Sequence, residues 1–528
     1  VSSHMFYECK KLETVVFGMN VTEIGGYAFY NCVNIGKVDL PKSLEILGNY
    51  SFSGCKSILS IDIPKTLNSC GENVFSNCSN LRTAEFEKGT IEVLDYLFEN
   101  CNGMKYINLP DSITKIGKKS FYNCELLNNF IMNDNVTLIG EMAFYNCSSL
   151  QKIKLSKNLT SLSGMAFGNC TSLKEINIPK TLKNCGSDWI IIGSSTYTYV
   201  GPFFGCESLK TISFDDGITY IPSMLFSMCS GIEKIELPST ITEIKDYAFY
   251  CCPNLKEVEM CDNITSIGEM VFYNCKTLQK INLPKKLIRL SGMAFGNCSS
   301  LMEINIPKTL KNCGSDWVII GYSTYTYVGP FHGCSTLKDV SFEIGIDEIP
   351  ELLFEGCTGI EKISIPDTTI SIGAKTFSDC VGLIEVLGMK NVTEIGSSAF
   401  HGCSQLKSIS IPDTLKRWGT DIFSGCTGLA TVEIPDDFIN IPSDTFMNCS
   451  SLKEIKLPAS LKTINSNAFN GSGLTEIIIP DGVTSIGSNA FQNCTSLASV
   501  RIPNRVTSLG TYIFDGCSSL TDVTLGKG

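Results

Sequence analysis

The stretch Ile395–Cys403 reads IGSSAFHGC, and Ile486–Cys494 reads IGSNAFQNC. Its Phe and its Cys recur along the whole chain at an interval of about 23 residues, a period in the range that is typical of repeat proteins. In this register the chain has 22 phenylalanines, and 21 of them are followed by Cys at the third position. A strict period of this length predicts a solenoid, in which each repeat buries its apolar side against its neighbours. The phenylalanines in register are Phe6, Phe29, Phe52, Phe75, Phe98, Phe121, Phe144, Phe167, Phe203, Phe226, Phe249, Phe272, Phe295, Phe331, Phe354, Phe377, Phe400, Phe423, Phe446, Phe469, Phe491 and Phe514.

One repeat contains three segments with different predicted conformations. The segment Leu-x-x-Ile-x-Ile-Pro, as at Leu173–Pro179, predicts a short strand that ends at Pro, because Pro cannot donate to a ladder. The segment Val-Thr-x-Ile-Gly, as at Val483–Gly487, predicts a second short extended piece, and we expect its Gly to adopt a turn conformation that other residues would strain. The segment Ala-Phe-x-x-Cys has helical spacing over about one turn, so we expect a short α or 3₁₀ turn there.

Leu-x-x-Ile-x-Ile at a fixed period is the signature of leucine-rich repeats. With Pro after the strand and Ile-Gly-x-x-Ala-Phe-x-x-Cys following, the chain resembles the BspA-like (Treponema-type) leucine-rich-repeat surface proteins over essentially all of its 528 residues. The resemblance implies a leucine-rich-repeat solenoid of about 22 repeats, each about 23 residues long. We therefore expect residues 1–528 to form a single curved right-handed rod of short parallel β-strands, turns and short α or 3₁₀ segments.

The charge and the hydrophobicity of the chain exclude several classes of partner. The formal net charge is −11, whereas proteins normally bind nucleic acids and anionic membranes through a basic patch. No stretch of about 18 apolar residues is present, so we expect no direct insertion into a membrane. The N-terminus has no signal peptide and neither end has a polar cap, so we expect a fragment whose targeting and anchor segments lie outside it.

Two insertions, Trp189–Gly201 and Trp317–Gly329, interrupt the period. Each consists of β-prone residues, a turn and an alternating Tyr-Thr-Tyr-Val run, which predicts a small hairpin or loop that projects from the stack. The surrounding blocks, Val136–Phe214 and Ile264–Phe342, match one another when they are aligned end to end. This match indicates a recent block duplication, and it is no sign of selection for function.

The insertions concentrate large aromatic residues, which on a projecting loop mark a recognition surface. The alternative is that the Trp folds back over the core and the loop is inert, since added loop length costs little. The candidate binding residues are Trp189, Tyr197, Tyr199, Trp317, Tyr322, Tyr325 and Tyr327.

The exposed face of the first predicted strand is a second candidate surface, because solenoids commonly bind through such a face. Its central column is polar and slightly acidic, with no aromatic anchor of the kind that dominates binding energy. The flanking columns mix Lys and Glu, as at Lys174-Glu175, which is typical of solvated surface. We therefore place the insertions ahead of the strand face.

The cysteine count of 26 raises the alternatives of a metal site and a disulfide ladder. No Cys-x-x-Cys pair occurs, so the usual zinc spacings are absent and we expect no metal. Cysteines in neighbouring repeats would point in parallel, which leaves their Cβ atoms too far apart for a good bridge. We expect free thiols that pack as small hydrophobic groups, including Cys70, Cys185 and Cys313 in the place of the core Ile before Gly.

Catalytic chemistry finds little support in the residues. His4, His332 and His401 are the only histidines, and each occupies a variable position of the repeat. General acid–base work and nucleophile activation most often use His, and no phosphate-binding Gly-rich loop occurs. We therefore expect no enzyme activity and no cofactor.

The resemblance and the architecture together favour a non-catalytic binding or adhesion module of a secreted or cell-surface protein. Its expected partner is a protein or glycan ligand, with host and extracellular-matrix molecules among the candidates. Two alternatives stay open: a structural spacer or stalk that presents another domain, and an intracellular scaffold, which free thiols would permit.

Overall fold

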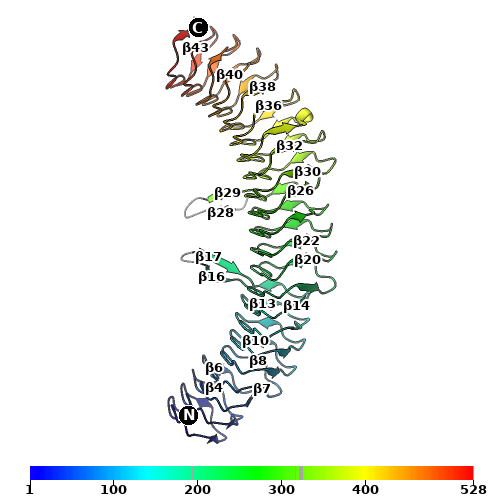
Figure 1. Ribbon diagram of the computed structural model, residues 1–528, viewed down its shortest axis with the longest axis vertical. Helices are drawn as coiled ribbons and strands as arrows, with labels where there is room; N and C mark the ends of the chain where they lie inside the picture. The colour runs from blue at the N-terminus through cyan, green and yellow to red at the C-terminus, as the bar shows by residue number, and fades with distance from the viewer. Residues whose placement is uncertain (193–195, 315–316, 320–324, 527–528) are drawn as a thin grey trace. The chain divides into compact units, whose positions relative to one another are not determined.

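The structure, a computed structural model, describes residues 1–192, 196–314, 317–319 and 325–526. These residues form two compact units, Val1–Cys261 (unit 1) and Asp262–Gly528 (unit 2), each a stack of coils that carries two rows of parallel strands (Figure 1). The predicted leucine-rich-repeat solenoid is therefore confirmed within each unit, and a single solenoid over residues 1–528 stays a prediction.

In unit 1, the first strand row contains β1 (Thr14–Val15), β3 (Lys37–Val38), β5 (Ser60–Ile63), β7 (Thr83–Phe86), β9 (Tyr106–Asn108), β11 (Asn129–Ile131), β14 (Glu175–Ile178), β18 (Thr211–Phe214), β20 (Lys234–Glu236) and β22 (Glu257–Glu259). The second row contains β2 (Glu23–Ile24), β4 (Ile46–Leu47), β6 (Ser69–Cys70), β8 (Glu92–Val93), β10 (Lys115–Ile116), β12 (Leu138–Ile139), β13 (Ser161–Leu162), β15 (Asn184–Cys185), β19 (Tyr220–Ile221) and β21 (Glu243–Ile244). A hairpin of β16 (Asp188–Ile192) and β17 (Thr196–Val200) belongs to neither row.

In unit 2, the first row contains β24 (Lys280–Ile281), β26 (Glu303–Ile306), β30 (Asp339–Phe342), β32 (Lys362–Ser364), β34 (Glu385–Leu387), β36 (Ser408–Ser410), β38 (Thr431–Glu433), β41 (Glu476–Ile477), β43 (Ser499–Arg501) and β45 (Asp522–Thr524). The second row contains β23 (Ser266–Ile267), β25 (Arg289–Leu290), β27 (Asn312–Cys313), β31 (Glu348–Ile349), β33 (Ser371–Ile372), β35 (Glu394–Ile395), β37 (Arg417–Trp418), β39 (Asn440–Ile441), β40 (Thr463–Ile464), β42 (Ser485–Ile486) and β44 (Ser508–Leu509). The hairpin here is formed by β28 (Trp317–Ile319) and β29 (Tyr325–Tyr327).

Each strand pairs with the equivalent residues of the next coil, so the register follows the sequence period. Ile61 on β5 lies opposite Ala84 on β7, which in turn lies opposite Ile107 on β9. Strand β5 ends directly before Pro64, as the segment predicts. The second strand is also where the sequence predicts it, for example β42 within Val483–Gly487.

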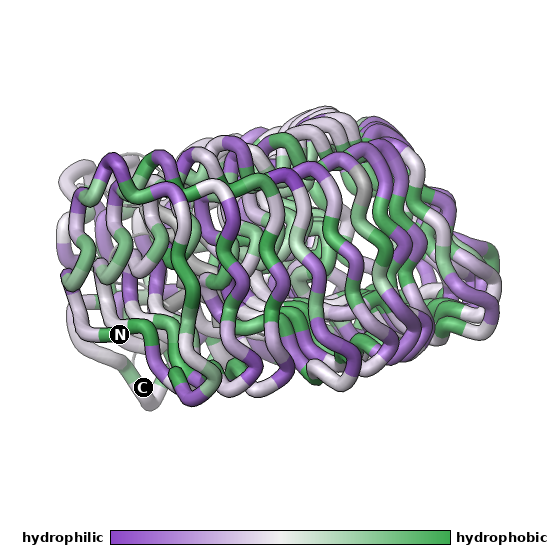
Figure 2. The backbone as a smooth tube through the Cα atoms, turned by 90° about the horizontal axis from the view of Figure 1, so that it is seen from below, coloured by the Kyte–Doolittle hydropathy of each residue, from purple (hydrophilic) through white to green (hydrophobic). Residues whose placement is uncertain are grey.

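The core of each unit is a column of phenylalanine rings stacked from coil to coil. Phe29, Phe52 and Phe75 are fully buried, with ring centroids 5.1 and 5.6 Å apart along the column. Parallel offset rings at this separation add stabilisation beyond the apolar area they bury. Figure 2 shows hydrophobic positions recurring at equivalent places in successive coils.

The Ala-Phe-x-x-Cys segment is a series of hydrogen-bonded turns rather than the predicted short helix. Tyr27 and Asn31, on either side of Phe29, have φ of 57° and 55°, and such left-handed residues interrupt a helix. The backbone N–H of Phe29 instead donates to the carbonyl of Ser51 in the next coil, at 2.8 Å. Among the described residues the only helix is the 3₁₀ helix η1 (Met389–Asn391), and no helix there is long and apolar enough to span a membrane.

The recurring Gly of Ile-Gly-x-x-Ala-Phe is explained by close packing between coils and not by the predicted turn conformation. Gly48 and Gly314 do not have positive φ. A Cβ on Gly48 would lie 2.3 Å from the backbone N of Gly26, and one on Gly314 would lie 2.0 Å from the N of Gly292. At Gly48 and Gly314 the coils therefore approach too closely for a side chain, although other coils carry a larger residue in this column, such as Ser163 and Lys245.

All 26 cysteines lie among the described residues, and none of them forms a disulfide. Those of the Phe-x-x-Cys column are mostly buried beside the stacked rings, which agrees with the predicted packing role. Their thiols also make a contact that the sequence did not predict: the Sγ of Cys55 donates to the carbonyl of Phe29 in the preceding coil at 3.2 Å, and the Sγ of Cys78 to that of Phe52 at 3.2 Å.

Candidate functional site

Both insertions form antiparallel hairpins, which confirms the prediction from sequence (Figure 1). In unit 1, Trp189 lies directly opposite Tyr199, and Ile191 lies opposite Tyr197. In unit 2, Trp317 lies opposite Tyr327. The two hairpins therefore repeat one register, with Trp facing Tyr across the strand pair at the base of each.

The structure places six of the seven predicted binding residues on these four hairpin strands, and it describes the surroundings of one of them, Tyr199. Tyr322 lies outside the described residues. The side chains of the other five also lie outside the described part, and these residues are Trp189, Tyr197, Trp317, Tyr325 and Tyr327. Their part in binding stays a prediction.

The base of the first hairpin packs on the coils of unit 1. Val200 is fully buried, and the ring of Tyr199 lies 6.0 Å from that of Tyr247, two coils further along. The hydroxyl of Ser227 donates to the carbonyl of Tyr199 at 3.1 Å. A Cβ on Gly201 would lie 2.0 Å from the carbonyl oxygen of Met224, so the chain can return to the coil at this point only with Gly.

The base of the second hairpin repeats this anchoring with different partners. Val328 is 1% exposed and packs with Met293, Met270 and Tyr273. As in unit 1, an apolar residue at the end of the insertion enters the core and fixes the base of the hairpin. This contact does not by itself decide between an inert loop and a recognition loop, but it fixes the point at which each hairpin leaves the coil.

An ion pair is present at the second hairpin base. The carboxylate of Glu355 accepts a hydrogen bond from the backbone N–H of Gly329 at 3.2 Å and lies 2.7 Å from Nδ1 of His332. This hydrogen bond with Glu355 raises the pKa of His332, against the opposing effect of burial. In unit 1, Phe204 stands in the place of His332 and Ser227 in the place of Glu355. Of the two hairpins, only the second therefore has this charge-dependent contact.

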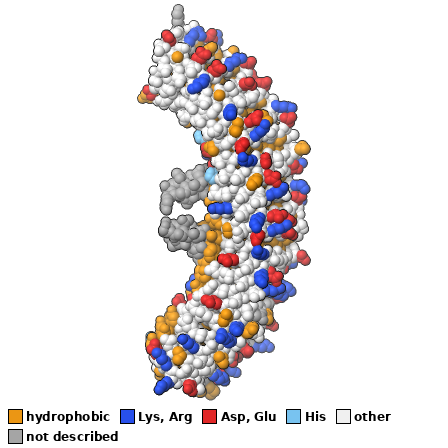
Figure 3. All heavy atoms as spheres, viewed as in Figure 1, with side chains coloured by type: hydrophobic (Ala, Val, Ile, Leu, Met, Phe, Trp, Pro, Cys, Tyr) orange, Lys and Arg blue, Asp and Glu red, His pale blue; other side chains and the backbone are white. Residues whose placement is uncertain are grey.

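An aromatic strip that the sequence analysis missed lies along the turns of unit 1. His4 stacks on Tyr27 at 4.9 Å between ring centroids, Tyr27 on Tyr50 at 5.0 Å, and Tyr7 on Tyr30 at 5.0 Å. The space-filling view shows hydrophobic side chains, which include Tyr in its colour key, gathered along one side of unit 1 (Figure 3). These residues fill the variable positions around Ala-Phe. Their recurrence from one repeat to the next is the sequence pattern that could have predicted the strip.

The first strand row carries charges that neutralise one another between coils. Glu233 binds Lys210 at 2.7 Å and Lys256 at 2.9 Å, and these contacts lower the pKa of Glu233 to about 2. In unit 2, Lys338 binds Glu361 at 2.7 Å in the same manner. Figure 3 shows acidic and basic side chains interspersed over this row. Such exposed pairs contribute little to stability, and they leave no uniform field to attract a charged ligand.

The histidines and acidic residues form no catalytic constellation in the part of the chain that the structure describes. His401 lies 3.1 Å from Asp421, a pairing that raises the pKa of His401, and the nearby hydroxyl of Ser398 donates to the Asp421 carboxylate at 2.9 Å. No group of three His, Cys, Asp or Glu side chains could hold a metal ion among the described residues.

A family model of the BspA-type leucine-rich repeat region, a unit of six repeat copies, matches the chain five times. The matched residues are 1–105, 91–191, 196–317, 323–430 and 423–528. Together these matches cover nearly the whole chain. No curated protein matches it.

Several solved bacterial leucine-rich-repeat structures are similar to this chain. One is a leucine-rich repeat protein of Bacteroides ovatus, 23% identical, with 91% of this chain and 87% of that chain covered and a TM-score of 0.43. Another is a leucine-rich cell-surface protein of Faecalibacterium prausnitzii, 19% identical, with 96% and 88% covered and a TM-score of 0.23. The leucine-rich repeat protein of T. pallidum is also 19% identical, with 42% and 77% covered and a TM-score of 0.26.

Proposed function

Because the chain belongs to the BspA-type leucine-rich-repeat family, we propose that it is a non-catalytic binding module of a secreted or cell-surface protein. The ligand is a protein or a glycan that the two hairpins contact. The observation that carries this proposal is the repeated pairing of Trp189 with Tyr199 and of Trp317 with Tyr327. Large aromatic residues supply most of the binding energy at protein interfaces.

Anchoring of the hairpins supports the proposal physically. A binding loop loses less entropy on association when its base is already held. The buried Val200 and Val328 hold the two bases, while the hairpins themselves continue away from the coils. Two equivalent hairpins in one chain would also allow a repetitive ligand to be held at two points.

The test is capture of ligands by the full chain from an array of immobilised extracellular-matrix proteins and glycans. We expect at least one ligand to be bound, and binding to fall at least about tenfold in a chain carrying both Trp189→Ala and Trp317→Ala, which corresponds to about 1.4 kcal/mol. Tyr106→Ala and Tyr512→Ala remove aromatic side chains that are 50% and 68% exposed outside the hairpins, and they serve as controls. Unchanged capture by the double Trp variant would remove the hairpins from the proposal.

The spacer alternative has its own supporting observation, the mutual neutralisation of charges along the first strand row. A surface whose ionic groups are already paired between coils needs no ligand to satisfy them. Capture of nothing by the native chain would favour this role over binding.

A further inference from the structure

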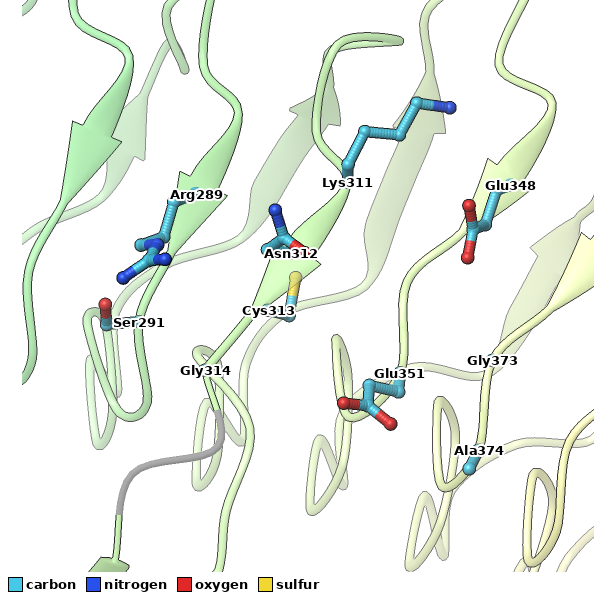
Figure 4. A pocket seen from close by; sticks show the side chains of 10 residues that line it. All are labelled: Arg289, Ser291, Lys311, Asn312, Cys313, Gly314, Glu348, Glu351, Gly373 and Ala374. Atoms are coloured by element: carbon cyan, nitrogen blue, oxygen red, sulfur yellow. The ribbon is translucent and has the colours of Figure 1, made fainter.

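A hollow of about 430 Å³ lies on the second strand row of unit 2, next to the point where the second hairpin leaves the coil (Figure 4). Arg289 lines it from β25, Asn312 and Cys313 from β27, Glu348 from β31, and Glu351 from the turn that follows β31. Its size is in the range of sites for small ligands, but most of its lining is polar. A polar ligand therefore suits it better than an apolar one.

The hollow lies at a break in the second strand row. Strand β27 ends one sheet and β31 begins another, so the two are not paired. The same break follows β15 in unit 1, but there the side chain of Tyr220 occupies the position of Glu348, and Lys245 lies 4.1 Å above its ring. In unit 2 the position of Lys245 is taken by Gly373, which leaves the space open.

The two walls of the hollow carry opposite charges. Lys311 on one side is bound to Asp347 on the other at 2.5 Å, which ties the walls together at one end. Arg289, Glu348 and Glu351, by contrast, form no ion pair with any described residue. The charge of Glu351 reaches the floor of the hollow, because it raises the pKa of Cys313 after the larger effect of burial.

We propose that this hollow binds a zwitterionic segment of an extended peptide, with an acidic side chain at Arg289 and a basic side chain at Glu348 and Glu351. The guanidinium of Arg289 offers paired donors that match a carboxylate, and the two carboxylates match an ammonium or guanidinium group. Arg289 and Glu348 occupy the same column two coils apart, which is about 10 Å at one strand spacing per coil. Two residues separated by two others in an extended chain span about the same distance.

This inference deepens the proposed function by naming a peptide chemistry, but it concerns a surface beside the hairpin and not the hairpin aromatics. The test is saturation-transfer NMR of the full chain with the peptide acetyl-Glu-Gly-Gly-Lys-amide at millimolar concentration. We expect saturation of the Glu and Lys side-chain protons in the native chain. Arg289→Gln or Glu351→Gln should lower the signal at least about fivefold, since each removes one charge pairing worth about 1 kcal/mol.

Matched variants distinguish the hollow from general surface charge. Arg417→Gln and Glu394→Gln remove a paired Arg and Glu on the same strand row, where they bind one another at 2.6 Å, and they should leave the signal unchanged. The neutral peptide acetyl-Gln-Gly-Gly-Gln-amide should give no signal. Equal saturation of the neutral peptide, equal signals in the Arg289 and Arg417 variants, or saturation only of an N-acetylneuraminic acid probe would each overturn the proposal.

The peptide NMR experiment and the array capture experiment together separate this proposal from the hairpin proposal. A chain that saturates the charged peptide but captures no ligand from the array supports the hollow and refutes hairpin binding. A chain whose capture depends on Trp317 but which leaves the charged peptide unsaturated supports the hairpin and refutes the hollow. Far-UV circular dichroism checks the fold, which exposed substitutions at Arg289 and Glu351 should leave intact.

Discussion

The thiol of Cys55 donates a hydrogen bond to the carbonyl oxygen of Phe29, 3.2 Å away in the preceding coil. The same carbonyl accepts the backbone N–H of Cys32, also at 3.2 Å, so it is a point where two coils are joined. The Cys of Phe-x-x-Cys therefore serves as a small buried group and as a donor between coils. Ser472, which replaces this Cys once, keeps a hydroxyl at the same place, 3.3 Å from the Sγ of Cys494.

Replacement of Cys55 should separate these two roles. Cys55→Ala removes buried volume and the donor, and we expect it to lower the free energy of unfolding by about 1–2 kcal/mol. Cys55→Ser keeps a donor and should cost less. Urea titration followed by circular dichroism measures both, with Cys9→Ala as the control because Cys9 is exposed. Equal losses for the Ser and Ala variants would show that the hydrogen bond contributes nothing.

Buried thiols should also make the fold sensitive to alkali. Burial raises the pKa of Cys170 and of Cys334 to about 12, whereas an unfolded thiol has a pKa of about 8.5. A raised folded-state pKa stabilises the fold fully below the unfolded value, and this stability is lost as pH rises from about 8.5 towards 12. We therefore expect the contribution of the thiols to the urea midpoint, measured under reducing conditions, to be level between pH 6 and 8 and to fall at higher pH.

A single substitution can check that thiols cause this fall. Cys170→Ala removes one buried thiol, so its free energy of unfolding should fall less steeply than that of the native chain. The difference in slope should be at most about 1.4 kcal/mol per pH unit, the value for one proton. Cys9→Ala should keep the native slope. Identical slopes for all three chains would assign the alkaline sensitivity to other groups.

The fold could be predicted because each buried position recurs in every coil, so that Phe75 and Phe98 carry the same information. Two details of the coil could not be read from one repeat. The close approach at Gly48 depends on the distance to the preceding coil, which no local pattern records. The left-handed residue before Cys did leave a signal, the alternation of Asn and Gly seen at Asn31 and Gly54, since both residues tolerate positive φ.

The candidate site was predictable only in part, for a related reason. The hairpins follow from β-prone residues around a turn, and their strands were found where expected. Tyr247 and Tyr273 occupy variable positions, each two coils away from the hairpin base that it adjoins. Only the stacking of coils brings such residues together. Whether the hollow beside β27 is open likewise depends on the residues of the next two coils, which are Glu348 and Gly373 here.

The glycine column offers a sharp test of coil-to-coil packing. Gly48→Ala places a Cβ 2.3 Å from the backbone N of Gly26, where only backbone movement can relieve the overlap. We expect the free energy of unfolding to fall by about 1–3 kcal/mol, the usual cost of overpacking. Gly36→Ala is the matched control, because nothing lies within 4 Å of its Cβ position and its φ is not positive. Urea midpoints that fall equally for both variants would argue against close packing as the reason for Gly48.

The ion pair at the second hairpin base should make unit 2 respond to pH. Glu355 raises the pKa of His332, and Asp379 adds a smaller effect in the same direction. A His with a raised folded-state pKa adds stability that is complete below about pH 6.5 and is lost as pH rises through the raised value. Glu355→Gln should therefore lower the free energy of unfolding by about 1–2 kcal/mol more at pH 5.5 than at pH 8.

The measurement is the urea midpoint of native and variant chains at both pH values. Glu351→Gln is the control, since Glu351 is exposed and makes no ion pair with His332 among the described contacts, so its effect should be the same at pH 5.5 and pH 8. Hydrogen exchange at residues 328–334 locates the effect, because loss of the Glu355 carboxylate also weakens the acceptor for the N–H of Gly329. A Glu355→Gln penalty that is the same at both pH values would show that His332 stays neutral in the folded chain, and the charge-dependent hold on the hairpin base would then be wrong.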